Sequence, residues 1–129
     1  MKQLTVLILA FVTFAFRQSP CEKISPEMHL EELKFNFGFL HQGEITSHDF
    51  IFTNTGDEPL IIQQADVSCK CTTVDYPKGP IKKSQKETIR VTFDSKTTIG
   101  RQERTVLLKS NALNSPVTLT FKCVVLKAK

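Results

Sequence analysis

Two cysteines separated by one residue carry the clearest potential for chemistry in this 129-residue sequence. They lie in the segment VSCKCTTVDYPKGPI, residues 67–81. In an extended strand, Cys69 and Cys71 would point to the same face, with Cα atoms about 6.7 Å apart. Because disulfide-bonded cysteines have Cβ atoms only about 3.5–4.5 Å apart, we expect Cys69 and Cys71 not to be bonded to each other. The β-branched residues 72–74 favour extended backbone, and the side chain of Lys70 disfavours a turn with positive φ.

Two thiolates on one face of a strand could bind a soft metal ion such as copper(I) or zinc. Cys69 and Cys71 are therefore candidate metal ligands, although zinc would need two further ligands and no histidine lies nearby in the sequence. A redox-active pair, buried thiols, and disulfides to the other cysteines, Cys21 and Cys123, are the alternatives. Four cysteines allow three complete pairings, and the sequence does not choose among them. Apart from this metal ion, we expect no cofactor.

The remaining polar residues do not form a catalytic pattern. Ser47, His48 and Asp49 are adjacent, and neighbours in a strand point to opposite faces, so these residues cannot form a catalytic relay. A solvated loop is the interpretation we favour for four clustered lysines, and a site for an acidic ligand or an anionic surface is the alternative. These lysines are Lys78, Lys82, Lys83 and Lys86. The sequence therefore indicates a protein that is not an enzyme.

The hydrophobic residues that must position the cysteines alternate with period two, which is typical of half-buried strands. The alternating or apolar runs lie at residues 33–37, 45–54, 60–62, 86–94, 105–108 and 117–126. On the last of these, we expect Cys123 to face inward as a buried thiol, together with Phe121 and Val125. About seven short strands at intervals of roughly ten residues predict an all-β fold, an immunoglobulin-like antiparallel β-sandwich.

The N-terminus has the pattern of an export signal. Lys2 precedes the uncharged residues 4–16, which are too few for a membrane-spanning helix and fit a secretory signal peptide. The expected division is a signal peptide over residues 1–20, a polar tether over 21–32 and an immunoglobulin-like β-sandwich domain over 33–127. Pro20 argues against a lipid anchor at Cys21. Export would place the mature chain in the periplasm or outside the cell, where disulfides persist.

Several motifs follow one another in a recognisable order: Gly-x-x-x-x-Gly, Phe-x-Asn-Thr-Gly, Ser-Cys-x-Cys-Thr and a closing Ser-Asn. Their residues are Gly38, Gly43, Phe52, Asn54, Thr55, Gly56, Ser68, Cys69, Cys71, Thr72, Ser110 and Asn111. In these motifs the chain resembles the bacterial family called domain of unknown function 1573, over residues 33–126. The resemblance implies an exported immunoglobulin-like sandwich and brings no known activity. The chain departs from the family pattern at Lys70, at Lys83-Ser84, at Glu87 and at Cys123, where the family has glycine or a Pro-Gly turn.

These observations favour an exported, non-enzymatic β-sandwich module that binds another protein of the bacterial cell envelope or supports an envelope assembly. The alternative is a thiol-based metal-binding or redox protein that acts through Cys69 and Cys71. The formal net charge of +4 is too small to indicate nucleic-acid binding. We therefore expect neither a nucleic-acid partner nor a membrane span.

Overall fold

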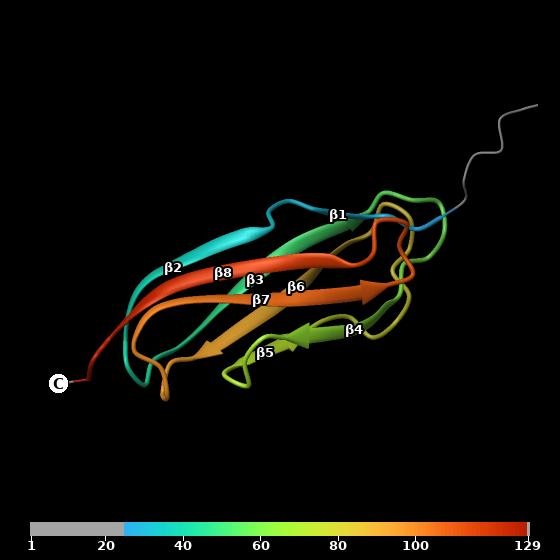
Figure 1. Ribbon diagram of the computed structural model, residues 1–129. Helices are drawn as coiled ribbons and strands as arrows, with labels where there is room; N and C mark the ends of the chain where they lie inside the picture. Colours follow the sequence, from blue (N-terminus) through green and yellow to red (C-terminus); the bar gives the residue numbers. More distant parts are fainter. Residues whose placement is uncertain (1–24, 129) are drawn as a thin grey trace, which may run out of the picture.

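The computed structural model describes residues 25–128 as eight β-strands in two stacked sheets (Figure 1). The strands are β1 (Met28–Leu30), β2 (Lys34–His41), β3 (Ile45–Asn54), β4 (Ile62–Val67), β5 (Thr72–Asp75), β6 (Lys86–Asp94), β7 (Gly100–Ser110) and β8 (Val117–Leu126). This all-β sandwich confirms the predicted immunoglobulin-like fold. The predicted signal peptide lies outside the described residues.

Each sheet has four strands. The first sheet, here called sheet A, has the order β1-β3-β6-β5, and the second, sheet B, has the order β2-β8-β7-β4. All pairs in sheet A are antiparallel, whereas β2 runs parallel to β8 in sheet B. The predicted antiparallel sandwich did not include this parallel pair. The pair arises because the chain crosses between the sheets before and after β2. β2 is therefore an edge strand of sheet B.

The domain begins earlier than the predicted boundary at residue 33. Strand β1 lies inside the predicted tether and pairs with β3, with Met28 opposite Asn54. Met28 is buried in the core, and the side chain of Asn114 bonds both its N–H and its C=O. A strand of three residues is too short to show an alternating pattern, so periodicity could not indicate it.

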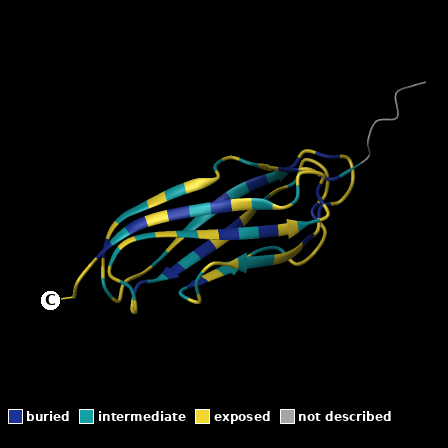
Figure 2. Cartoon of the chain, viewed as in Figure 1, coloured by how far each residue is buried: buried dark blue, intermediate teal, exposed yellow. Residues whose placement is uncertain are grey.

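The core lies between the sheets and is formed by alternate residues of the long strands. Figure 2 shows buried and more exposed positions alternating along β8 and β6. The predicted inward face of β8 is confirmed: Phe121, Cys123 and Val125 are all buried. Phe93 of β6 and Phe121 of β8 bring their ring centroids within 5.4 Å, which ties the two sheets together across the core.

Asn54, at the end of β3, is completely buried and uses both ends of its side-chain amide. Its Oδ1 accepts hydrogen bonds from the backbone N–H groups of Gly56, at 3.0 Å, and Glu27, at 3.3 Å. Its Nδ2 donates to the carbonyl oxygens of Glu58, at 2.8 Å, and Ile81, at 3.0 Å. One side chain thus joins the N-terminal segment, the turn after β3 and the segment that precedes β6.

Gly56 explains the end of the Phe-x-Asn-Thr-Gly motif. A Cβ atom at this position would lie 2.0 Å from the carbonyl oxygen of Ser25 and 2.6 Å from the Cα atom of Pro26. Because both are backbone atoms, the contact could not be relieved by a side-chain rotation. The N-terminal segment therefore packs directly against the turn that Asn54 holds.

Asn111 makes a similar pair of bonds at the protein surface. Its Oδ1 accepts from the N–H of Ile61 at 2.8 Å, and its Nδ2 donates to the carbonyl of Pro59 at 3.1 Å. Unlike Asn54, Asn111 is exposed, so water can replace its bonds. Asn54 and Asn111, the two asparagines of the family motifs, thus both use their side-chain amides to bond backbone groups, Asn54 in the core and Asn111 at the surface.

We expect Asn54→Ala to lower the free energy of unfolding by more than about 2 kcal/mol, because each buried polar group left without a partner costs roughly 1–3 kcal/mol. Asn111→Ala is the matched control and should cost less than about 1 kcal/mol, since its partners become hydrated. Urea unfolding followed by circular dichroism measures both values. Equal losses in the two variants would contradict the role assigned to Asn54.

Candidate functional site

Cys69 and Cys71 form a disulfide, with an S–S distance of 2.01 Å and a Cα–Cα distance of 5.2 Å. The prediction that these two cysteines are not bonded to each other is therefore wrong. The Cα–Cα distance is shorter than the value of about 6.7 Å for residues i and i+2 of a strand. The segment is thus not extended at the cysteines.

The error came from the assumed backbone. The N–H of Thr72 donates to the carbonyl of Cys69 at 3.1 Å, which closes a β-turn over these residues. Among the described non-glycine residues, only Ser84 has a positive φ. Lys70 therefore fits into the turn without the steric penalty that a side chain incurs at positive φ. The β-branched residues do form an extended strand, but this strand, β5, begins at Thr72 and leaves the cysteines outside it.

The disulfide lies where the chain passes from one sheet to the other. Cys69 follows β4 of sheet B, and Cys71 precedes β5 of sheet A (Figure 1). Ser68 bonds to β7 through Thr105, with its N–H donating and its Oγ accepting, each at 3.1 Å. The carbonyl of Cys71 accepts a hydrogen bond of 2.9 Å from the N–H of Asp94. Asp94 is the last residue of β6, which neighbours β5 in sheet A. The bonded turn is therefore anchored to both sheets.

A metal site at Cys69 and Cys71 would need the disulfide to be reduced first, because the ligands would be thiolates. Within residues 25–128, no group of three or more His, Cys, Asp or Glu side chains could hold a metal ion. The metal site stays a prediction for the reduced protein.

Cys123 is a free thiol and only 3% exposed. Burial raises the pKa of this thiol, and the positive charge of Arg104 opposes the rise. A buried thiol with a raised pKa forms little of the thiolate that reacts. Cys123 is therefore a core residue, as predicted, and it does not pair with the other cysteines in this structure.

His48 and Asp49 have separate partners. His48 is hydrogen-bonded through Nε2 to the carboxylate of Glu32, and its ring stacks on the ring of Phe35, with centroids 3.5 Å apart. Asp49 accepts two hydrogen bonds from Arg90, at 2.7 and 3.0 Å, and this arginine lowers the pKa of the carboxyl group. The two side chains thus lie in different networks on opposite faces of β3, as the alternation predicts.

The clustered lysines are largely engaged with separate neighbours. Lys83 forms an ion pair with Asp57, and Lys86 forms one with Glu31 at 3.1 Å. The ammonium group of Lys78 lies 3.3 Å from the centroid of the Tyr76 ring. These contacts favour the interpretation as a solvated loop.

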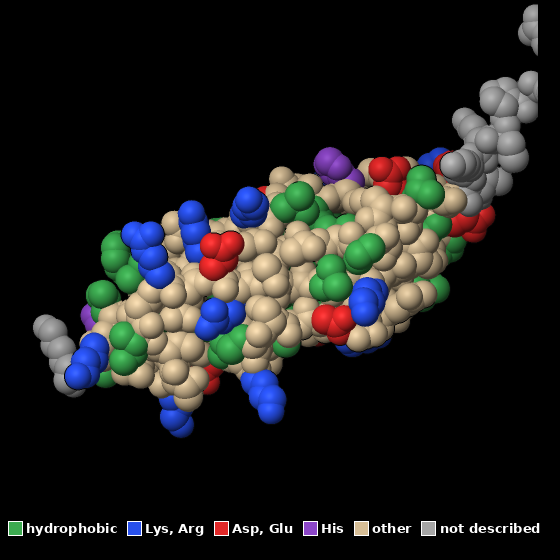
Figure 3. Space-filling model, viewed as in Figure 1, with side chains coloured by type: hydrophobic (Ala, Val, Ile, Leu, Met, Phe, Trp, Pro, Cys, Tyr) green, Lys and Arg blue, Asp and Glu red, His purple; other side chains and the backbone are tan. Residues whose placement is uncertain are grey.

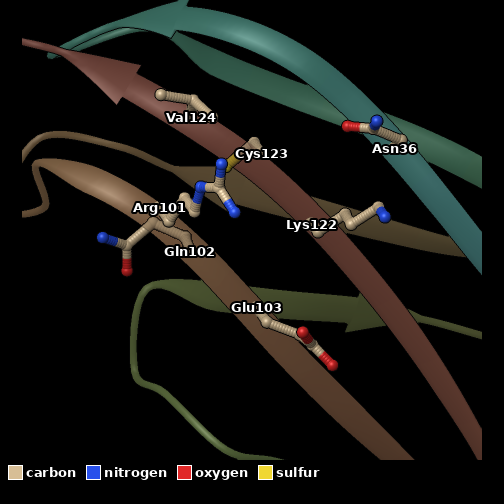
Figure 4. A pocket seen from close by; sticks show the side chains of 7 residues that line it. All are labelled: Asn36, Arg101, Gln102, Glu103, Lys122, Cys123 and Val124. Carbon is tan, nitrogen blue, oxygen red and sulfur yellow. The ribbon is translucent and has the colours of Figure 1, made fainter.

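A basic and apolar surface that the sequence motifs did not indicate lies on the outer face of sheet B. One shallow hollow is lined by Asn36, Arg101, Glu103, Lys122 and Val124, among others (Figure 4). A second hollow shares Asn36, Glu103 and Lys122 with it and is also lined by Lys34. On this side of the molecule Lys and Arg side chains gather over the end of β2 and β8, with apolar side chains beside them (Figure 3). Phe39, on β2, is 74% exposed.

A signal for this surface exists in the sequence, but it depends on register. The pairing places Asn36 beside Lys122 and Val124 beside both Phe39 and Arg101. A register shift between Asn36 and Gly38 turns Phe39 outward. Sequence alternation alone would have placed Phe39 on the inner face with Phe35 and Phe37.

A family model described as "Protein of unknown function (DUF1573)" matches residues 28–125. No significant match is found among curated proteins. No helix within the described residues is long and apolar enough to cross a membrane.

Solved structures with the same fold include a protein of unknown function from Porphyromonas gingivalis, with a TM-score of 0.71 and 17% identity. The match covers 83% of this chain and 51% of that one, so this chain spans about half of its length. The PapD-like domain 7 of human CEP192 matches with a TM-score of 0.65 and 10% identity, over 100% and 99% of the two chains. The E. coli chaperone DraB matches with a TM-score of 0.54 and 14% identity, over 78% and 54%. At these identities the similarity shows the fold alone.

We expect alkylation by iodoacetamide, located by peptide mapping, to separate the three described cysteines. The folded protein without reductant should take no label at Cys69, Cys71 or Cys123. After mild reduction, Cys69 and Cys71 should be labelled while burial still protects Cys123, which should react only after denaturation. Labelling of Cys69 and Cys71 without reductant would contradict the disulfide.

Proposed function

This chain belongs to the DUF1573 family of proteins of unknown function, and on that premise we propose a function from its own surface. It is an exported, non-enzymatic β-sandwich module that binds another protein of the bacterial cell envelope. The observation that carries the proposal is a group of large apolar side chains that the closed core leaves outside. They are Phe39, Ile45, Ile99 and Leu126, with exposed fractions of 74%, 66%, 54% and 41%.

These side chains lie at one end of the sandwich. Leu126 pairs with His41, two residues after Phe39, and Ile99 immediately precedes Gly100, which pairs with Val125. The turn between β2 and β3 brings Ile45 to the same end, where the N–H of Gln42 donates to the carbonyl of Leu126. Clustered apolar side chains on a protein surface are typical of sites that contact another macromolecule.

The fold is compatible with this role. Sandwiches bind partners through edge strands and through the loops at their ends, and they need no catalytic residues for it. One structure with this fold is a chaperone, E. coli DraB. Because unrelated functions share such folds, the likeness supports the proposal only together with the exposed surface.

Two observations support export. The uncharged residues 4–16 have the length of the hydrophobic part of a signal peptide. Independently, the Cys69–Cys71 disulfide is of a kind that persists in oxidising compartments and is rare in the cytosol.

Photo-crosslinking in cells tests the binding function. A photoreactive phenylalanine analogue at Phe39 should give a discrete product of higher mass. The same analogue at Thr88, which is exposed on β6 of the other sheet, serves as the matched control and should give none. The absence of a product from position 39, or the same product from both positions, would contradict a binding surface at Phe39.

For export, we expect the chain recovered from the envelope fraction to have lost its N-terminus by cleavage between residues 15 and 20. Edman sequencing or intact mass measurement of that chain locates the new N-terminus. A chain that still begins at Met1 would overturn this part of the proposal.

A thiol–disulfide role for Cys69 and Cys71 is the second candidate, favoured by their disulfide and by the partial exposure of both residues. A thiolate of a partner dithiol would attack one sulfur and break the Cys69–Cys71 bond. The partner's second thiol would then release the mixed disulfide, so that two electrons pass from the partner to this pair. Alkylation in intact cells decides: a pair that is oxidised under all growth conditions contradicts this candidate.

A further inference from the structure

We infer that the free edge of β2 binds an extended, acidic segment of a partner protein, which adds to sheet B as a further strand. This inference rests on the proposed binding function and names the site and the partner's chemistry. The segment would carry carboxylates opposite the basic residues of sheet B and an apolar residue beside Phe39.

Strand β2 is the longest of the four edge strands. It has eight residues, against three in β1, four in β5 and six in β4. An edge strand presents unpaired backbone N–H and C=O groups, and its length decides how many of them a second strand can bind. The edge of β2 is therefore the best place in the described domain for strand addition.

The hydrogen bonds at the end of β2 show which groups face the free edge. The N–H of Gln42 donates to Leu126 of β8 at 2.8 Å. Since the backbone groups of alternate residues point to the same side of a strand, Leu40 also faces β8, and Phe39 and His41 face away. Both backbone groups of His41 are bonded to Glu44. The N–H and C=O of Phe39 are left for an incoming strand.

Positive charge collects beside this edge. Lys34 lies on β2, Lys122 on β8 beside Asn36, and Arg101 on β7 beside Val124. None of the three cations forms an ion pair with another described residue. Glu103, which is paired in register with Lys122, is the one acidic residue that lines the two hollows. The excess of positive charge complements an acidic segment.

The apolar part of the surface adjoins the basic part. Phe39 pairs in register with Val124, and Leu126 lies two residues further along β8. A phenyl ring that is 74% exposed next to these side chains can cover an apolar side chain of the added strand. This combination favours a peptide over a nucleic acid or a lipid surface. An extended peptide backbone supplies both the acceptor and the donor that the N–H and C=O of Phe39 need, at the spacing of a strand.

Fluorescence anisotropy with labelled octapeptides that alternate glutamate and valine tests the inference on the full mature chain. We expect saturable binding to the unmodified protein. The double variant Lys34→Glu/Lys122→Glu should bind about tenfold more weakly or worse. Lys82→Glu makes the same kind of charge change in a distant exposed loop and should leave binding within about twofold. Lys122→Gln, which removes the charge without reversing it, should give an intermediate loss.

A peptide methylated on alternate backbone nitrogens separates strand addition from simple charge attraction. It keeps the carboxylates but loses the amide donors on one side, and we expect it to bind at least about tenfold more weakly when those donors face β2. Binding of the unmethylated peptide should also slow the hydrogen exchange of the Phe39 N–H. Equal binding of both peptides, or no binding of either, would overturn the inference. Stronger binding of inorganic polyphosphate or of anionic lipid vesicles would overturn it as well.

The results also separate this inference from the proposed function. If Phe39 crosslinks to a protein in cells while the peptides and the charge variants show no effect, the binding function holds and the acidic strand is wrong. If crosslinking at position 39 also fails, both are wrong.

Discussion

The buried amide of Asn54 is the interaction on which the arrangement of this domain depends. It takes hydrogen bonds from the N-terminal segment and from the turn after β3, and it gives hydrogen bonds to the turn residue Glu58 and to Ile81. These groups are far apart in the sequence, and no water reaches the side chain to replace a missing partner. β1 can therefore lie along β3 only when this end of the sandwich is closed, and the direct packing of the N-terminal backbone on Gly56 imposes the same condition.

Two unusual features lie away from the end of the sandwich that Asn54 closes. The first is the turn at Cys69 and Cys71, where a covalent bond fixes the passage from sheet B to sheet A. The second is the edge of β2, where the sheet ends in a strand that carries an exposed phenyl ring beside unpaired cations. Phe39 lies outside the core, and both cysteines are partly exposed although Cys71 also packs against the core. Both features can therefore contact other molecules.

Alternation identified most of the fold. The pattern of β8 is regular because one face packs on the other sheet, and it predicted the burial of Phe121, Cys123 and Val125. The alternation did not predict the structure correctly where local backbone geometry or the register between strands determines it. β1 is too short to alternate, and the turn at Lys70 needs no positive φ, which the argument from its side chain had assumed. The basic surface was missed because Lys34, Arg101 and Lys122 lie on three strands whose alignment only the folded sheet defines.

The irregularity at Gly38 controls which aromatic rings of β2 lie at the surface. With regular pairing, the aromatic side chains at 35, 37 and 39 would all face the core, because strand positions two apart share a side. The shift between Asn36 and Gly38 adds one residue to β2 relative to β8, so the third ring is displayed on the outside instead. Regular pairing of the same residues would turn Phe39 toward the core, whereas removal of Phe37 or Gly38 would restore regular pairing and leave Phe39 opposite Val124. The display of this ring thus depends on the extra residue being taken up as a bulge, and a slip of β2 by one residue would remove the ring from the contact surface without any change of sequence.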